Sequence, residues 1–353
     1  MRRLAAWIRG CRLLWLMGLL TPFAALGPLA ALAQPAVDPH SPEVQLKIAA
    51  LERAHAAVVG IRSVAVDNAP SSEYLGQVRQ GSGVVIGADG LVVTIGYLIL
   101  EANDVELEVT AGRTVPARVV AYDLASGFGL LQALTPLRVA PVKLGSSKTL
   151  KDDDPLMIAS GGDEGDLSMA RLVSRRAFSG YWEYHIEDAL FTTPPRTDHS
   201  GAALFNANGE LLGIGSLVVM DALGPEKPNM PGNMFVPVDL LKAILPELRA
   251  HGATRSSTRA WLGLNCVEFD GMVRVVRVTP ASPAADAGIA PGDIILRIDG
   301  ANVSDLEGFY KTLWRGGTPE RDITLVVSRG GMLTSVTAHA KDRMKTLRKA
   351  QGV

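Results

Sequence analysis

The spacing of hydrophobic and polar positions changes along the chain. Near the start, Val44, Ile48 and Leu51 recur at helical spacing, and Ser41 stands where a helix N-cap is expected. From residue 57 onward, apolar residues come in short β-type runs separated by Gly, Asp or Pro, as in GSGVVIGADGLVVTIG. This pattern predicts many short strands, as in a β-barrel or sandwich.

A second domain is predicted in the C-terminal part of the chain. The pattern of residues 238–248 indicates a helix, and the polar stretch 251–259 has no hydrophobic face, so it indicates a linker. Beyond it, strands alternate with two short helices, the first in SPAADAGI. The second helix spans residues 304–314, where Ser304 and Glu307 have the spacing of a capping box.

The first 33 residues have the pattern of a secretory signal peptide. Four arginines precede or adjoin an apolar stretch that ends in small residues, and Pro22 and Gly27 interrupt it. We therefore expect cleavage after Ala33 rather than retention as a membrane anchor. The remaining chain has one cysteine, Cys266, which cannot form an internal disulfide. Export without disulfides is typical of a Gram-negative periplasm, which is the predicted location.

Composition limits the class of protein and the partners that can be expected. The chain has 353 residues, 47% of them hydrophobic, which is enough for two or three domains with proper cores. Lys and Arg number 35 against 36 Asp and Glu, and no basic run occurs. Nucleic acid is therefore not an expected partner.

Two sets of motifs resemble one known family. GSGVVI at 81–86 and DGLVVT at 89–94 resemble the opening barrel strands of HtrA/DegP-type serine proteases. WLGL at 261–264, SPAADAG at 282–288 and PGDII at 291–295 resemble a bacterial PDZ domain. The resemblance implies a mainly β protein, with a chymotrypsin-like double β-barrel followed by a small α+β PDZ domain.

The same resemblance implies domain boundaries. The expected order is a signal peptide at 1–33, a linker and helix at 34–56, a trypsin-like (HtrA-type) serine protease domain at 57–250, a linker at 251–259, a PDZ domain at 260–342 and a C-terminal tail at 343–353.

The catalytic positions depart from the family pattern. Family chemistry needs a serine nucleophile, a histidine base, an aspartate that orients the histidine, and backbone N–H groups around the oxyanion. The resemblance places Ser200 at the nucleophile, Tyr97 at the histidine and Gly127 at the aspartate. Asp198 replaces the oxyanion glycine. A phenol with a pKa near 10 stays protonated at neutral pH, so we expect a pseudoprotease, with Tyr97 and Phe128 filling the lost space.

Alternatives remain open at this point. An active endopeptidase could use Ser200 with a base from outside the family pattern, His185 or His199. The chain could instead be a structural subunit of mixed oligomers with active paralogues. His185 and Glu187 have strand spacing suited to metal ligation, but no second pair accompanies them, so neither a metal nor another cofactor is predicted.

The PDZ motif predicts peptide binding. Its loop should present N–H groups to a terminal carboxylate while the next strand accepts the peptide as an added strand. The residues expected to bind are Trp261, Leu262, Gly263, Leu264, Phe309 and Leu313, with the leucines and Phe309 lining an apolar pocket. The sequence thus predicts an exported, inactive protease homologue that binds C-termini or unfolded segments of envelope proteins as scaffold, holder or regulator. It could form homo-oligomers, and it would contact a membrane only if the leader were retained.

Overall fold

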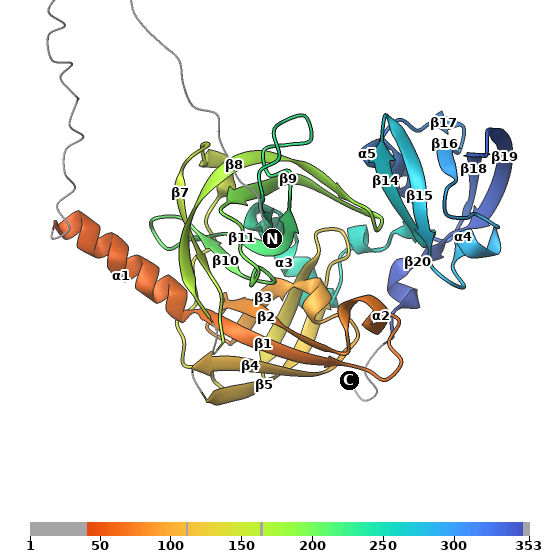
Figure 1. Ribbon diagram of the computed structural model, residues 1–353. Helices are drawn as coiled ribbons and strands as arrows, with labels where there is room; N and C mark the ends of the chain where they lie inside the picture. Colours follow the sequence, from red (N-terminus) through yellow and green to blue (C-terminus); the bar gives the residue numbers. More distant parts are fainter. Residues whose placement is uncertain (1–40, 111, 163–164, 349–353) are drawn as a thin grey trace, which may run out of the picture.

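The computed structural model describes residues 41–110, 112–162 and 165–348. The predicted signal peptide lies outside the described residues. Within them, no helix is both long enough and apolar enough to cross a membrane. The described chain is mainly β, with two closed barrels followed by a smaller α+β region (Figure 1).

The first barrel has six strands in the order β1-β2-β3-β6-β5-β4. They are β1 (Val58–Ala65), β2 (Val78–Val85), β3 (Leu91–Ile95), β4 (Ala102–Thr110), β5 (Arg113–Tyr122) and β6 (Phe128–Ala133). The predicted β-type runs become these strands because closure pairs every edge and buries the inward side chains. All five residues of β3 are buried, which explains its uninterrupted apolar run.

The second barrel has the order β10-β11-β12-β9-β8-β7. Its strands are β7 (Pro155–Ala159), β8 (Leu167–Gly180), β9 (Tyr184–Thr193), β10 (Ala203–Phe205), β11 (Leu211–Val219) and β12 (Gly232–Pro237). The predicted turn at residues 206–209 does join β10 to β11. The long β8–β9 hairpin extends from the barrel toward the C-terminal region (Figure 1).

Helices flank the barrels. The longer ones are α1 (Pro42–Ala56) and α3 (Val238–His251), and the shorter ones are α2 (Ser72–Leu75) and the 3-10 turns η1 (Gly96–Leu98), η2 (Ser147–Thr149) and η3 (Arg255–Ser257). The predicted N-cap of α1 is confirmed, since the backbone N–H of Val44 donates to Ser41 Oγ at 3.4 Å. The predicted helix at 238–248 is also present and continues to His251.

The segment predicted as a linker, residues 251–259, is tied to the first barrel by hydrogen bonds. Thr254 and Ser257 are buried, and both hydroxyls donate to Oδ1 of Asp123, which is itself 1% exposed. The other carboxylate oxygen of Asp123 accepts from Ser126 N at 2.8 Å. Two polar residues of this segment thus satisfy a buried carboxylate.

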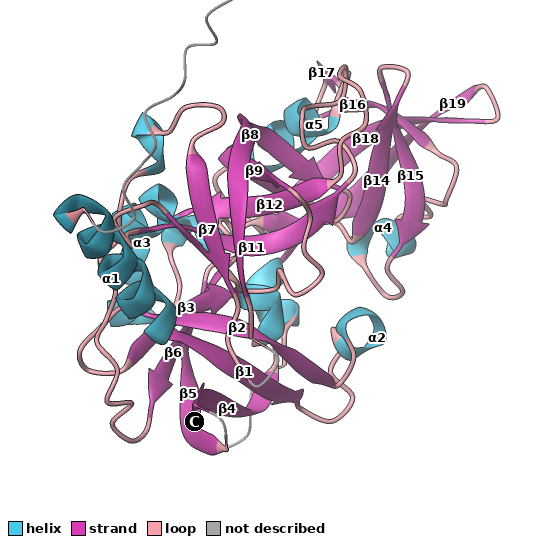
Figure 2. Ribbon diagram, turned by 60° about the vertical axis from the view of Figure 1, so that its left-hand side comes forward, coloured by secondary structure: helices cyan, strands magenta, loops and turns pink. Residues whose placement is uncertain are grey.

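The C-terminal region has a sheet ordered β14-β15-β16-β18-β19, with β14 at one edge (Figure 2). Its elements are β13 (Ala260–Trp261), β14 (Leu264–Phe269), β15 (Met272–Val278), α4 (Pro283–Asp286), β16 (Ile294–Ile298), β17 (Ala301–Asn302), α5 (Leu306–Arg315), β18 (Asp322–Arg329), β19 (Met332–His339), β20 (Lys341–Asp342) and η4 (Arg343–Thr346). Ile323, Leu325 and Val327 alternate along β18 with more exposed residues, so one face of the sheet packs on a separate core.

The predicted capping box of α5 is wrong by one residue. Asp305, not Ser304, is the N-cap, and its Oδ1 accepts from Gly308 N at 2.6 Å. A carboxylate caps well because it also meets the positive end of the helix dipole. Glu307 pairs with Lys311 at 2.6 Å.

Candidate functional site

Ser200 lies in the loop between β9 and β10, where close backbone contacts hold it. Its carbonyl accepts from Ser82 N at 2.8 Å, which joins this loop to the first barrel. Gly201 follows with φ +73°, and a Cβ there would lie 1.9 Å from the Ser82 carbonyl oxygen. Only glycine fits this approach, so the sequence fixes the position of Ser200 between the two barrels.

Tyr97 contacts Ser200 directly. The Tyr97 hydroxyl lies 2.8 Å from Ser200 Oγ and 2.9 Å from the carbonyl oxygen of Ser216. A carbonyl oxygen can only accept, so the phenol proton is directed to Ser216 and the Ser200 hydroxyl is left to donate to the phenol oxygen. Burial raises the pKa of Tyr97 to about 12, with the Ser200 hydrogen bond opposing this weakly. A neutral phenol therefore occupies the place where proton transfer would need a base.

The space beside Gly127 is filled by a residue that the sequence did not indicate. Gly127 has φ +81°, and a Cβ there would lie 2.8 Å from the Tyr184 hydroxyl oxygen. That hydroxyl donates to the Ser126 carbonyl at 2.9 Å. Phe128, expected with Tyr97 to fill the space of the lost triad, is fully buried in the same core cluster as Tyr184, and Tyr97 packs against that cluster. Tyr184 comes from β9, and no sequence spacing links it to Gly127.

The Asp198 side chain is held by polar partners. Arg196 Nε donates to its Oδ1 at 2.9 Å, and Ser160 Oγ donates to its Oδ2. Burial acts to raise the pKa of Asp198, but the Arg196 and Ser160 hydrogen bonds outweigh it and lower the pKa. The carboxylate is therefore ionised at neutral pH, and its own backbone N–H also interacts with it. A negative charge thus lies two residues before Ser200, at the position that the sequence resemblance assigns to the oxyanion glycine.

The two candidate substitute bases have other partners. His199 Nδ1 lies 3.0 Å from the Thr197 carbonyl, and burial lowers the pKa of His199. His185 Nδ1 lies 2.9 Å from Ser179 Oγ on the β8–β9 hairpin. Among the hydrogen bonds of residues 41–110, 112–162 and 165–348, none joins either histidine to Ser200.

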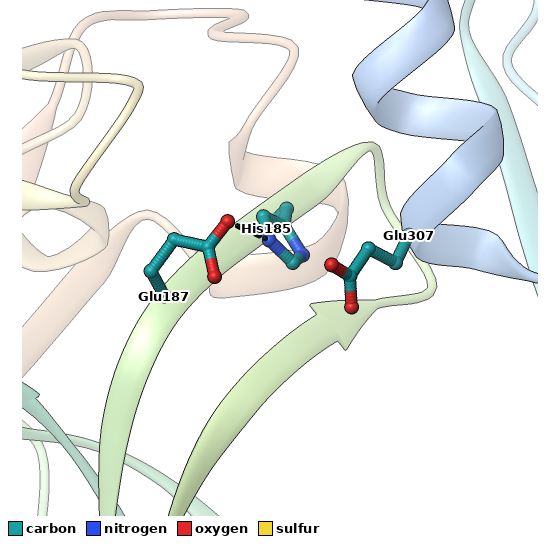
Figure 3. Close-up of side chains that lie close together, drawn as sticks. All are labelled: His185, Glu187 and Glu307. Carbon is teal, nitrogen blue, oxygen red and sulfur yellow. Dashed lines mark hydrogen bonds and ion pairs between the residues drawn. The ribbon is translucent and has the colours of Figure 1, made fainter.

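His185 also belongs to a group of potential metal ligands with Glu187 and Glu307 (Figure 3). One ligand atom from each lies within 4.8 Å of the others. However, Lys311 Nζ lies 2.7 Å from Glu187 Oε1 and 2.6 Å from Glu307 Oε1. One ammonium group thus already pairs with both carboxylates, and these contacts join β9 to α5.

The loop expected to capture a peptide carboxylate already holds one. Glu183, at the turn of the β8–β9 hairpin, accepts from Leu264 N at 2.7 Å and from Leu262 N at 3.2 Å. Burial raises the pKa of Glu183 to about 7, although these N–H groups and the charge of Arg343 oppose the rise. Gly263 between the donors has φ +83°, which lets both N–H groups converge. The sequence placed the donors but gave no sign of this acceptor.

The apolar residues expected to line an open pocket are buried. Leu262, Phe309 and Leu313 are each 0% exposed and Leu264 is 2% exposed, all in the core of the C-terminal region. Trp261 is partly exposed and lies under the Arg343 guanidinium at 4.8 Å. The carboxylate loop and the first residues of β14 contact the hairpin, while Val267, Glu268 and Phe269 of β14 are exposed.

Sequence and structure comparisons agree on the architecture. The family profile of the trypsin-like peptidase domain matches residues 81–214, and that of the PDZ domain matches residues 260–339. The periplasmic serine endoprotease DegP of Escherichia coli K12 is 28% identical over 239 residues, covering 64% of this chain and 49% of that protein. DegP of Salmonella typhimurium is 29% identical with the same coverage. The solved structure of the HtrA-type protease AlgW with a tripeptide has a TM-score of 0.52 at 23% identity, covering 86% of this chain and 97% of that one.

The chain is similar to HtrA-type serine proteases that carry a PDZ domain. It spans about half the length of the curated relatives it matches. The peptidase match begins within β2 and includes β3 and the Ser200 loop, while β13 to β19 account for the PDZ match. The expected mainly β fold with a following PDZ domain is confirmed.

Proposed function

We propose that this HtrA homologue is a proteolytically inactive, exported protein that binds peptide segments through its PDZ domain. The observation that carries the first part is the contact between Tyr97 and Ser200. A nucleophilic serine needs a group that takes its proton, and a phenol with a pKa of about 12 is almost entirely protonated at neutral pH. Two further features support the same interpretation. Tyr184 fills the space beside Gly127, the residue at the predicted triad aspartate position, and ionised Asp198 brings a negative charge to the predicted oxyanion position.

Peptide binding is supported by the PDZ domain itself. The Leu262 and Leu264 N–H groups already bind a carboxylate, which is the chemistry of C-terminal capture. Solved relatives of the HtrA type are described with a bound tripeptide or decapeptide. We infer that this chain takes C-termini or unfolded segments of envelope proteins. The periplasmic location of the DegP relatives and the leader pattern support export.

The test of inactivity uses the nucleophile directly. The purified mature chain and its Ser200→Ala variant are treated with a fluorophosphonate probe, and intact mass is measured. An active serine protease labelled in parallel shows that the probe works. We expect no adduct in either form and no cleavage of an unfolded protein substrate. An adduct and cleavage that both disappear in Ser200→Ala would refute the proposal and establish an endopeptidase with an unexpected base.

A further inference from the structure

The tip of the β8–β9 hairpin lies on the edge of the PDZ domain where a peptide would bind (Figures 1 and 2). We define this PDZ edge as the loop from Leu262 to Leu264 together with β14. Because β14 is an edge strand, its outward N–H groups can pair with another segment. One of them is used in this way: Cys266 N donates to the Tyr181 carbonyl at 2.8 Å.

The hairpin contacts have the register of one bound strand. The Glu183 carboxylate accepts from Leu264 N, and the carbonyl of Tyr181, two residues earlier, accepts from Cys266 N, two residues later. Successive residues of a strand alternate in direction, so a spacing of two on both segments is what antiparallel addition requires. A side-chain carboxylate thus stands where a peptide would place its terminal carboxylate.

The hairpin tip is held from α5 as well. Tyr310 is fully buried, and its hydroxyl donates to the Gly180 carbonyl at 2.8 Å and accepts from Glu183 N at 3.2 Å. Glu183 itself has φ +57°, a conformation that is sterically unfavourable for a residue with a Cβ. The backbone conformation alone would favour glycine at this position. The contacts of the carboxylate with the PDZ edge therefore explain why the residue is a glutamate.

We propose that the hairpin tip, residues 180–184, is an internal ligand that closes the PDZ edge, and that a protein C-terminus with a free carboxylate opens it by displacing Glu183. The competition with a C-terminus rests on the proposed function of peptide binding. The contact itself does not, because it is made within one chain. The occupant and the competitor would make the same two contacts, a carboxylate on the loop and a backbone carbonyl that accepts from Cys266 N.

Amide hydrogen exchange tests the internal contact without any ligand. In the mature chain, the amides of Leu264 and Cys266 should be protected, and Glu183→Ala should speed their exchange by about tenfold or more, since the buried hydrogen bonds to the Glu183 side chain are lost. Asp188→Ala is the matched control, because Asp188 is an exposed acidic residue of the same hairpin with φ +53°. It should leave both amides unchanged. Equal protection in Glu183→Ala and wild type would overturn the proposal.

Peptide titration tests the competition. The probes are decapeptides ending in Val, Leu or Ile, each with a free carboxylate or a C-terminal amide. Glu183→Ala should bind the free acids about tenfold or more tightly than wild type and Asp188→Ala do, and the amides should bind to none. Equal, tight binding by wild type and Glu183→Ala would refute the internal ligand while leaving peptide binding intact. If no peptide binds any variant although exchange depends on Glu183, peptide binding fails and the internal contact alone stands.

Discussion

Replacing Gly127 with alanine should destabilise the protein by much more than an ordinary glycine substitution. At φ +81°, any residue with a Cβ is strained by about 1–2 kcal/mol. The new Cβ would also lie 2.8 Å from the Tyr184 hydroxyl, which would have to leave its 2.9 Å hydrogen bond to the Ser126 carbonyl. Loss of that buried bond adds about 1–2 kcal/mol. We therefore expect a total cost of about 2–4 kcal/mol.

Equilibrium urea unfolding followed by circular dichroism measures this cost. The control is Gly112→Ala, because Gly112 has φ +72° but a Cβ there would meet no atom within 4 Å, so it suffers the backbone strain alone. The double variant Gly127→Ala, Tyr184→Phe should cost less than the sum of its single variants, by about 1 kcal/mol. If Gly127→Ala costs no more than Gly112→Ala, or if the double variant is additive, Tyr184 does not fill the aspartate position. A coupled result would mean that an aspartate at 127 requires a second change at 184.

Two further predictions concern buried carboxylates. The docked Glu183 has a pKa raised from 4.5 to about 7, so docking of the hairpin is favoured below pH 4.5 and weakens as the pH rises to 7, by up to about 3 kcal/mol. The titratable groups that face Glu183 are Arg343, Tyr310 and Cys266, and burial raises the pKa of the tyrosine and of the thiol away from this pH range. Exchange of the Cys266 amide, corrected for intrinsic rates, should therefore accelerate from pH 5 to 8. The Glu183→Gln variant, which has no carboxyl group to titrate at this position, should show no such acceleration. Asp123→Asn should destabilise the mature chain by about 2–4 kcal/mol in urea unfolding, because buried hydroxyl donors lose their charged acceptor; a cost below about 1 kcal/mol would contradict the buried network.

The spacing of apolar residues was sufficient to predict most of the local structure. The N-cap of α1, the helix after β12 and the hairpin of β18 and β19 all follow from nearby residues. Local patterns failed where two neighbouring residues could both cap a helix: the N-cap of α5 is Asp305, one residue after the predicted Ser304. They gave no indication of distant polar partners, such as Asp123 for Thr254 and Ser257.

The sequence by itself determined the architecture, because motifs of adjacent residues carry it, and it predicted which residues stand at the family's catalytic positions. Only the tertiary structure decided what surrounds those positions. Tyr184 meets Gly127, and Glu183 meets the PDZ loop, through a hairpin that packs against two parts of the chain distant in sequence. Such contacts depend on how the barrel and the PDZ domain pack together, which the spacing of apolar residues does not encode.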